Sequence, residues 1–194
     1  MMKKHYVIMQ AAMILACIFT TVGTPLIVTM QGSANCITYF GYYASCLSTT
    51  FANVQDEPDS LFCVEFKQMQ TGAGGCLIVA DILFLICSIL TLLEFKCDKP
   101  VRKLVFYWVN FGTACASNLF IITAMVITYL MQNETLCNGV SLRALNFVWG
   151  PAQGVIFTGL ALGLFGAGAY FFLPLCFPEF DEGIDDEVKH HAEE

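Results

Sequence analysis

Charged side chains are scarce in this sequence: they make up 13% of its 194 residues, against about a quarter in an ordinary soluble domain. Hydrophobic residues make up 57%, and the mean hydropathy is +0.66. No aqueous core of a chain this short could take so many apolar side chains, so lipid must be the solvent for most of them. The length suits one compact membrane domain.

Several residue patterns that carry chemistry are missing. No Cys-x-x-Cys pair is present, which counts against a disulfide reductase, and the three histidines, His5, His190 and His191, all lie near the ends of the chain. The sequence has no phosphate-binding glycine loop and no nucleophile elbow. It also has no basic patch interleaved with aromatic residues that would bind RNA or DNA. We therefore expect a protein that is not an enzyme, needs no cofactor or metal, and binds no nucleic acid.

What the sequence does have is long apolar runs. Four of them reach the roughly 20 residues that a helix needs to cross a bilayer, at residues 6–30, 74–93, 104–131 and 151–173. Helices are expected because a lone strand would leave backbone groups unpaired in lipid. The predicted fold class is an all-α membrane protein, a four-transmembrane-helix bundle formed by residues 1–178. The first run exceeds the roughly 7–15 apolar residues of a signal peptide, which favours an uncleaved anchor over a signal cleaved after Ala34.

The basic residues predict an orientation. Seven of the nine lysines and arginines lie before the first run, between the second and third, or after the fourth, and only Lys67 and Arg143 lie on the other side. By the positive-inside rule both termini are cytoplasmic, with residues 31–73 and 132–150 outside. Eight of the 16 acidic residues fall in residues 179–194, which predicts a disordered acidic cytoplasmic tail. The expected location is the plasma membrane.

Four cysteines fall on the predicted outside, where the surroundings are oxidising: Cys36, Cys46, Cys63 and Cys137. They allow three complete pairings. A hairpin turning on residues 40–42 would place Tyr39 opposite Tyr43 and Cys36 opposite Cys46, near the disulfide range. This favours a Cys36–Cys46 bond. The other two cysteines would then link the outer loops, and a free thiol at either of them is the alternative.

Two kinds of modification are expected. Asn133 begins an Asn-Glu-Thr glycosylation sequence on the predicted outside. Because it follows the third run by only about two residues, both an occupied and an empty site stay open. Cys97 and Cys176 meet the cytoplasmic interface, where acylation occurs, and a plain thiol is the alternative for each.

Residues 36–46 form an eleven-residue segment with a cysteine at each end. In kind and spacing it resembles the signature of the amastins, small four-span surface proteins of kinetoplastid parasites, at Cys36, Ile37, Thr38, Phe40, Gly41 and Cys46. Tyr39, Tyr43 and Ser45 depart from the usual pattern. The resemblance implies a helical bundle capped outside by a small disulfide-pinned sheet, as in claudin-type proteins. It also implies a role at the parasite surface, in contact with the host.

Asp81 is the one carboxylate deep inside a predicted span, roughly 10 Å below the outer surface at about 1.5 Å per residue. Thr24, Thr123 and Gln153 count to a similar depth. An ionisable residue in a span is a functional hypothesis by default, here a polar cavity that binds a cation or passes a proton. The alternative is a hydrogen-bonded Asp81 that holds the helices together.

Small residues recur every four positions in the fourth run, at Gly159, Gly163 and Ala167. This spacing lets helix backbones approach closely. The stripe packs either within the bundle or against a second copy of the chain, which would make a homo-oligomer.

Two functional classes follow. The first is a surface adhesion or membrane-organising protein whose first outer loop meets a protein partner through large amphipathic side chains, at Tyr39, Phe40, Gly41, Tyr42 and Tyr43. The same aromatic residues could instead form the core of the sheet. The second class is an ion or proton transporter, channel or auxiliary subunit that uses the polar residues around Asp81.

Overall fold

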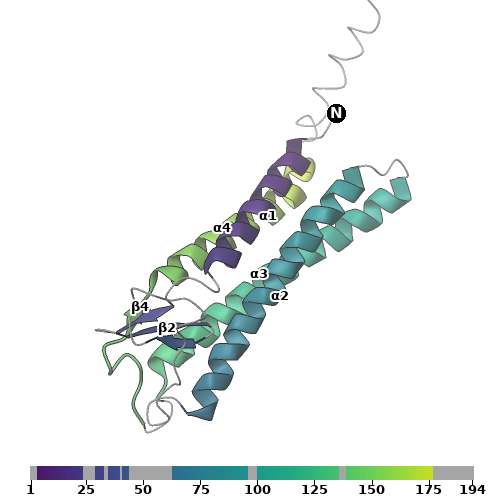
Figure 1. Ribbon diagram of the computed structural model, residues 1–194. Helices are drawn as coiled ribbons and strands as arrows, with labels where there is room; N and C mark the ends of the chain where they lie inside the picture. The colour runs from purple at the N-terminus through teal and green to yellow at the C-terminus, as the bar shows by residue number, and fades with distance from the viewer. Residues whose placement is uncertain are drawn as a thin grey trace, which may run out of the picture.

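The computed structural model describes residues 4–23, 29–32, 35–39, 41–43, 63–95, 100–135 and 139–176. Four long helices lie along one another, and a small sheet covers one end of them, here called the sheet end (Figure 1). The helices are α1 (Lys4–Gly23), α2 (Val64–Phe95), α3 (Pro100–Asn133) and α4 (Pro151–Cys176). The chain is therefore mostly helical, as its apolar runs predict.

Three helices are long and apolar enough to cross a membrane, in the stretches Val64–Glu94, Val105–Asn133 and Pro151–Phe172. The apolar part of α1, Val7–Val22, is shorter. Both α3 and α4 begin at a proline, where the missing backbone N–H costs no helical hydrogen bond.

The helix ends differ from the predicted spans in two places. The first span was predicted to run to Met30, but α1 ends at Gly23 and Met30 lies in a strand. The next residues are Thr24 and Pro25, and a residue before proline disfavours helical geometry. Conversely, α2 begins at Val64 rather than Gly74. Hydrophobicity marks only the part of a helix inside lipid, and this helix continues beyond it through polar residues.

The helices form two antiparallel pairs, α1 with α4 and α2 with α3, as Figure 1 shows. Small residues of α4 make close packing possible. A Cβ added at Gly159 would lie 2.9 Å from Thr20 Cγ2 of α1, and one at Gly163 would lie 2.5 Å from Asn118 Oδ1 of α3. Ala167 is buried in the same core. The predicted stripe therefore packs within the bundle.

The sheet has four short antiparallel strands in the order β3-β2-β1-β4. They are β1 (Met30–Gln31), β2 (Cys36–Thr38), β3 (Gly41–Tyr43) and β4 (Val148–Trp149). The first three come from the connection between α1 and α2, and β4 comes from the connection between α3 and α4. The sheet thus joins two parts of the chain that are far apart in sequence.

The predicted register of the hairpin is wrong. Cys36 pairs with Tyr43 and Thr38 pairs with Gly41, so the strands are joined at Tyr39 and Phe40 rather than around Gly41. The residue directly opposite Cys36 is therefore Tyr43, and Cys46 lies outside the described residues. The physical reason is the burial of Tyr39, which is 2% exposed and belongs to the core of the helices. A large aromatic side chain gains more from that burial than the turn gains from a central glycine.

Candidate functional site

Tyr39 attaches the sheet to the helices. Its hydroxyl lies 3.3 Å from Thr128 Oγ1 of α3 and accepts a hydrogen bond of 3.0 Å from Gln153 Nε2 of α4. Gln70 of α2 adds a bond of 2.6 Å from its Nε2 to the Thr38 carbonyl. Three helices therefore hold the sheet in place through polar contacts.

Two cysteines at the sheet end are oxidised among the described residues. Cys36 and Cys63 are both disulfide-bonded, which makes the alternative of a free thiol at Cys63 wrong. The predicted partners, Cys46 and Cys137, lie outside the described residues, so the pairing stays a prediction. The described cysteines of the helices are thiols, at Cys17, Cys76, Cys87 and Cys115.

The aromatic residues expected to contact a partner are instead part of the core. Tyr39, Tyr42 and Tyr43 are 2%, 8% and 2% exposed, and Gly41 is buried in β3. The Tyr42 hydroxyl accepts a bond of 2.6 Å from Asn35 Nδ2. The prediction of a binding surface is therefore wrong for these residues, because a buried side chain cannot anchor a partner. Phe40 lies outside the described residues.

Asp81 lies near the middle of α2 and faces α1. Its carboxyl group is hydrogen-bonded to Thr20 Oγ1, and Cys17 Sγ of α1 lies 3.9 Å from its carbonyl oxygen. The Thr20 hydroxyl also lies 2.9 Å from the Ala16 carbonyl. Thr20 therefore links the Asp81 carboxyl group of α2 to the backbone of α1.

The other members of the predicted polar layer lie elsewhere. Thr123 is exposed on α3 and donates to the Leu119 carbonyl of its own helix at 2.9 Å. Gln153 bonds Tyr39, as described above, and Thr24 lies outside the described residues. The prediction is therefore wrong for Thr123 and Gln153. The count gave the depth along each helix but not the face on which a side chain lies, and it did not indicate Thr20, which contacts Asp81.

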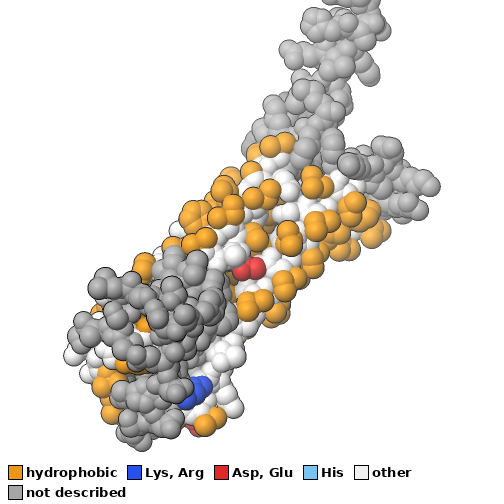
Figure 2. Space-filling view, viewed as in Figure 1, with side chains coloured by type: hydrophobic (Ala, Val, Ile, Leu, Met, Phe, Trp, Pro, Cys, Tyr) orange, Lys and Arg blue, Asp and Glu red, His pale blue; other side chains and the backbone are white. Residues whose placement is uncertain are grey.

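A groove with a volume of about 500 Å³ runs along α1 and α2 beside this contact. Most of its lining is aliphatic, and its polar members are Gln10, Cys17, Thr21 and Ser88. In Figure 2, acidic side-chain atoms lie among hydrophobic side chains on the face of the helices shown there. A carboxyl group thus reaches a surface that is otherwise apolar.

A second polar cluster lies at the end of the bundle away from the sheet. Glu94 of α2 is 1% exposed and accepts a hydrogen bond from the Tyr170 hydroxyl of α4. Nearby on α2 and α3, Asn110 Nδ2 donates to Thr91 Oγ1 at 2.7 Å, and Cys87 Sγ donates to Asn110 Oδ1 at 2.8 Å. The predicted span ended at residue 93, and α2 runs two residues further, to Phe95.

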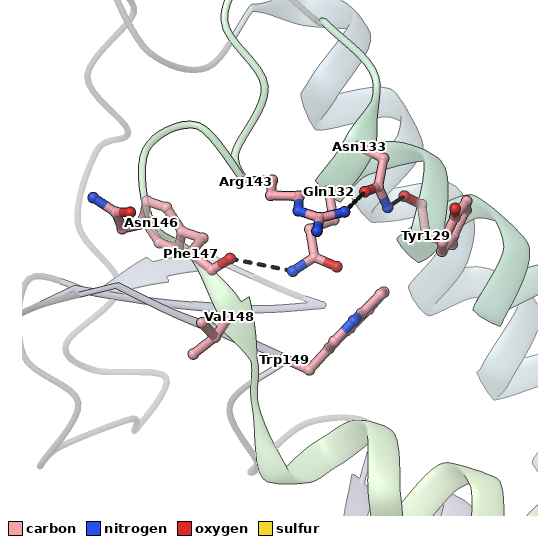
Figure 3. A pocket seen from close by; sticks show the side chains of 8 residues that line it. All are labelled: Tyr129, Gln132, Asn133, Arg143, Asn146, Phe147, Val148 and Trp149. Atoms are coloured by element: carbon pink, nitrogen blue, oxygen red, sulfur yellow. Dashed lines mark hydrogen bonds between the residues drawn. The ribbon is translucent and has the colours of Figure 1, made fainter.

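A pocket with a volume of about 370 Å³ opens at the sheet end, between the end of α3 and β4 (Figure 3). Its lining comes from α3 and from the connection to α4: Tyr129, Gln132, Asn133, Arg143, Asn146, Phe147, Val148 and Trp149. Sequence reasoning identified only Asn133 in this set. The others lie up to twenty positions apart and form no motif, so only their folded arrangement reveals the site.

Hydrogen bonds hold the pocket in shape. Gln132 Nε2 donates to the Phe147 carbonyl at 3.1 Å, and Arg143 Nη1 donates to Asn133 Oδ1 at 3.4 Å. Asn133 Nδ2 donates to the Tyr129 carbonyl at 2.9 Å. The amide nitrogen that would carry a glycan therefore has a partner in the folded chain, while glycosylation itself stays a prediction.

The remaining predicted sites have no described side chain. Cys97 and the acidic tail lie outside the described residues, and Cys176 is described only as the last residue of α4. Among the described residues, no three side chains of the His, Cys, Asp or Glu type lie together in a way that could hold a metal ion.

No family model, no curated protein and no solved structure matches this chain.

Proposed function

We propose that this chain is a four-span surface protein of the amastin type whose first outer loop contacts a protein partner. It acts in adhesion or membrane organisation and not as an enzyme. The segment that resembles the amastin signature, residues 36–46, begins in the sheet that covers the helices. The beginning of this segment therefore lies at the sheet end of the bundle.

The place of α1 supports a fourth span. It lies antiparallel to α4, with Thr20 beside Gly159 and Ala12 beside Gly166. Its 20 residues reach about 30 Å at 1.5 Å per residue, which matches the hydrocarbon of a bilayer. With four spans both termini lie on one side, and the positive-inside rule makes that side cytoplasmic. The sheet end then faces outward at the plasma membrane.

The observation that carries the proposal is the fixed base of the first outer loop. Tyr43 lies in β3, and Cys63 directly precedes α2. The neighbouring strand β2 is tied to three helices through Thr38, the following Tyr39 and their partners, and Cys36 and Cys63 are both disulfide-bonded. Residues 44–62 therefore start and finish on a rigid platform.

We assign the partner contact to residues 44–62, because the tyrosines before them are buried. This stretch contains no lysine or arginine, three acids, and large apolar residues, among them Phe51, Leu61 and Phe62. Charges across an interface steer encounter and set specificity. A partner with a basic surface fits this loop.

The test is adhesion of cells that express the full chain. Residues 47–61 are replaced by a Gly-Ser linker of equal length, which retains Cys46 and Cys63. We expect this variant to reach the surface at the normal level, measured with a terminal tag, and to lose adhesion to partner cells. A milder variant, D56N/E57Q/D59N, should weaken adhesion and reduce its dependence on salt. Equal adhesion by the linker variant and the unmodified chain would reject the proposal.

A second candidate, ion or proton transport, is favoured by the carboxyl group of Asp81 beside the α1–α2 groove. Glu94 supplies a second carboxyl group further along α2. The test is proton flux in liposomes that contain the purified chain and a pH-sensitive dye. Transport predicts flux that Asp81→Asn abolishes and Thr123→Val preserves, since Thr123 is exposed and donates to its own helix. Absence of flux in the unmodified chain rejects transport, and misassembly of Asp81→Asn indicates a structural role.

A further inference from the structure

The pocket described above lies at the level where two helices leave the membrane. Asn133 is the last residue of α3, and Trp149 immediately precedes Gly150 and the start of α4. Tyr129 and Trp149 are both exposed, and these residue types are enriched where a protein meets lipid headgroups. Lipid headgroups can therefore reach this pocket.

Several hydrogen-bond donors of the pocket lining make few or no bonds to other described residues. The Arg143 guanidinium has five N–H donors, and its one bond to another described residue is the long contact with Asn133. The Trp149 indole and the Tyr129 hydroxyl have no hydrogen-bond partner among the described residues. In Figure 3, the side chain of Gln132 lies between those of Arg143 and Trp149.

The lining carries one positive charge and no acidic residue. A guanidinium stays charged at all physiological pH values and presents paired donors that match a phosphate. Glu134 follows Asn133 in the chain but does not line the pocket. The chemistry of the pocket thus fits an anion with several acceptor oxygens.

An apolar stripe of α3 leads from the pocket into the membrane. Tyr129, Val126 and Ile122 are exposed and lie on one face of the helix, because positions three, four and seven apart align. Leu119 continues this exposed face. A free phosphate ester would leave the stripe unused, whereas an acyl chain would cover it.

We propose that this pocket binds the phosphate group of a phospholipid, whose acyl chain lies along the Leu119–Tyr129 face of α3. The site holds a lipid of the leaflet at the sheet end. Arg143 and Trp149 bind the phosphate oxygens, and Tyr129 lies at the boundary between headgroup and chain. This function is separate from partner contact by the first loop.

The two tryptophans of the chain allow a direct test. Trp108 and Trp149 are the two present, so a Trp108→Phe chain reports fluorescence from the pocket alone. The full chain in detergent is titrated with phosphatidic acid that carries brominated acyl chains, which quench a nearby tryptophan. Brominated diacylglycerol supplies the same chains without phosphate, and unlabelled glycerol 3-phosphate supplies the phosphate without chains.

We expect saturable quenching by brominated phosphatidic acid and at least ten-fold weaker apparent binding in Arg143→Gln. Lys67→Gln is the matched control, since it removes the other basic residue of this end without touching the pocket, and it should bind normally. Asn146→Gly provides a second pocket variant that keeps the left-handed backbone of this residue, where φ is 60°, and it should weaken binding. Circular dichroism verifies that the variants are folded.

Three results would overturn the proposal. Equal quenching by brominated diacylglycerol would show that phosphate is not recognised. Unchanged binding in both Arg143→Gln and Asn146→Gly would show that the pocket is not the site. Displacement of the lipid by glycerol 3-phosphate at equal concentration would show that the acyl chain contributes nothing, and the site would then bind free phosphate esters.

Discussion

At the scale of single residues, the hydroxyl of Tyr39 joins three elements. It lies between Thr128 and Gln153, in a region from which water is excluded. Burial raises the pKa of Tyr39 above the usual value for tyrosine, although its two hydrogen bonds act in the opposite direction. The hydroxyl therefore stays protonated in any physiological medium and remains able to donate.

Tyr39→Phe should destabilise the chain by about 1–3 kcal/mol, because it leaves the Gln153 amide and the Thr128 hydroxyl without this buried partner. Thermal unfolding of the detergent-solubilised chain, followed by circular dichroism, measures the change. The control is Tyr129→Phe, which removes a hydroxyl that has no partner among the described residues. If both variants unfold at the same temperature as the unmodified chain, Tyr39 does not hold the sheet through its hydroxyl.

At the scale of elements, α4 determines how closely the helices approach. Gly163 lies against Asn118 of α3 and Phe84 of α2, whereas Gly168 has nothing within 4 Å of its missing side chain. The same residue type on one helix thus has two roles. One position requires glycine and the other tolerates a larger residue.

Gly163→Ala should destabilise the bundle by about 1–3 kcal/mol, since the added methyl group forces Asn118 and Phe84 to move. Gly168→Ala should be neutral or stabilise the helix by about 0.5–1 kcal/mol. Unfolding in a denaturing detergent titration compares the two variants. Equal loss of stability in both would mean that helix propensity, and not contact with α3, decides the result.

Elements also show what the sequence could predict. Long apolar runs predicted α2, α3 and α4 because helices are the form that satisfies backbone groups in lipid. They did not predict that α2 begins at Val64 or that it includes Glu94, since hydrophobicity says nothing about a helix that continues through polar residues.

Sites made of distant residues were harder to predict. The hairpin register depended on burial of Tyr39 between helices, which no local pattern records. The pocket combines the last turn of α3 with the connection before α4, so no spacing pattern along the chain predicts it. Asn133 was predicted as a glycosylation site and not as part of a pocket.

At the scale of the whole molecule, contacts at both ends join the two helix pairs. At the sheet end, β4 pairs with β1, and Tyr39 reaches both α3 and α4. At the opposite end, Tyr170 of α4 bonds Glu94 of α2. The α1–α4 pair and the α2–α3 pair are therefore connected at both ends of the bundle. We expect them to move as one unit.

The number of spans is a prediction about the whole chain. Epitope tags at both termini should be stained only after the cells are permeabilised, while a tag inserted at residue 55 should be stained on intact cells. Four spans with a cytoplasmic N-terminus require this pattern, because an even number returns the chain to its starting side. Staining of both the N-terminal tag and the tag at residue 55 on intact cells would mean that α1 does not cross the membrane.

The pairing of α1 with α4 also has a consequence for synthesis. The first helix is synthesised before its main partner, α4, and β4, which completes the sheet, precedes α4 by one residue in the chain. The nascent protein therefore has an unmatched first helix and an open sheet until the last part of the chain emerges from the ribosome. Truncated chains that stop before residue 148 lack both β4 and α4, so they should keep both surfaces uncovered and be recognised by quality control for degradation.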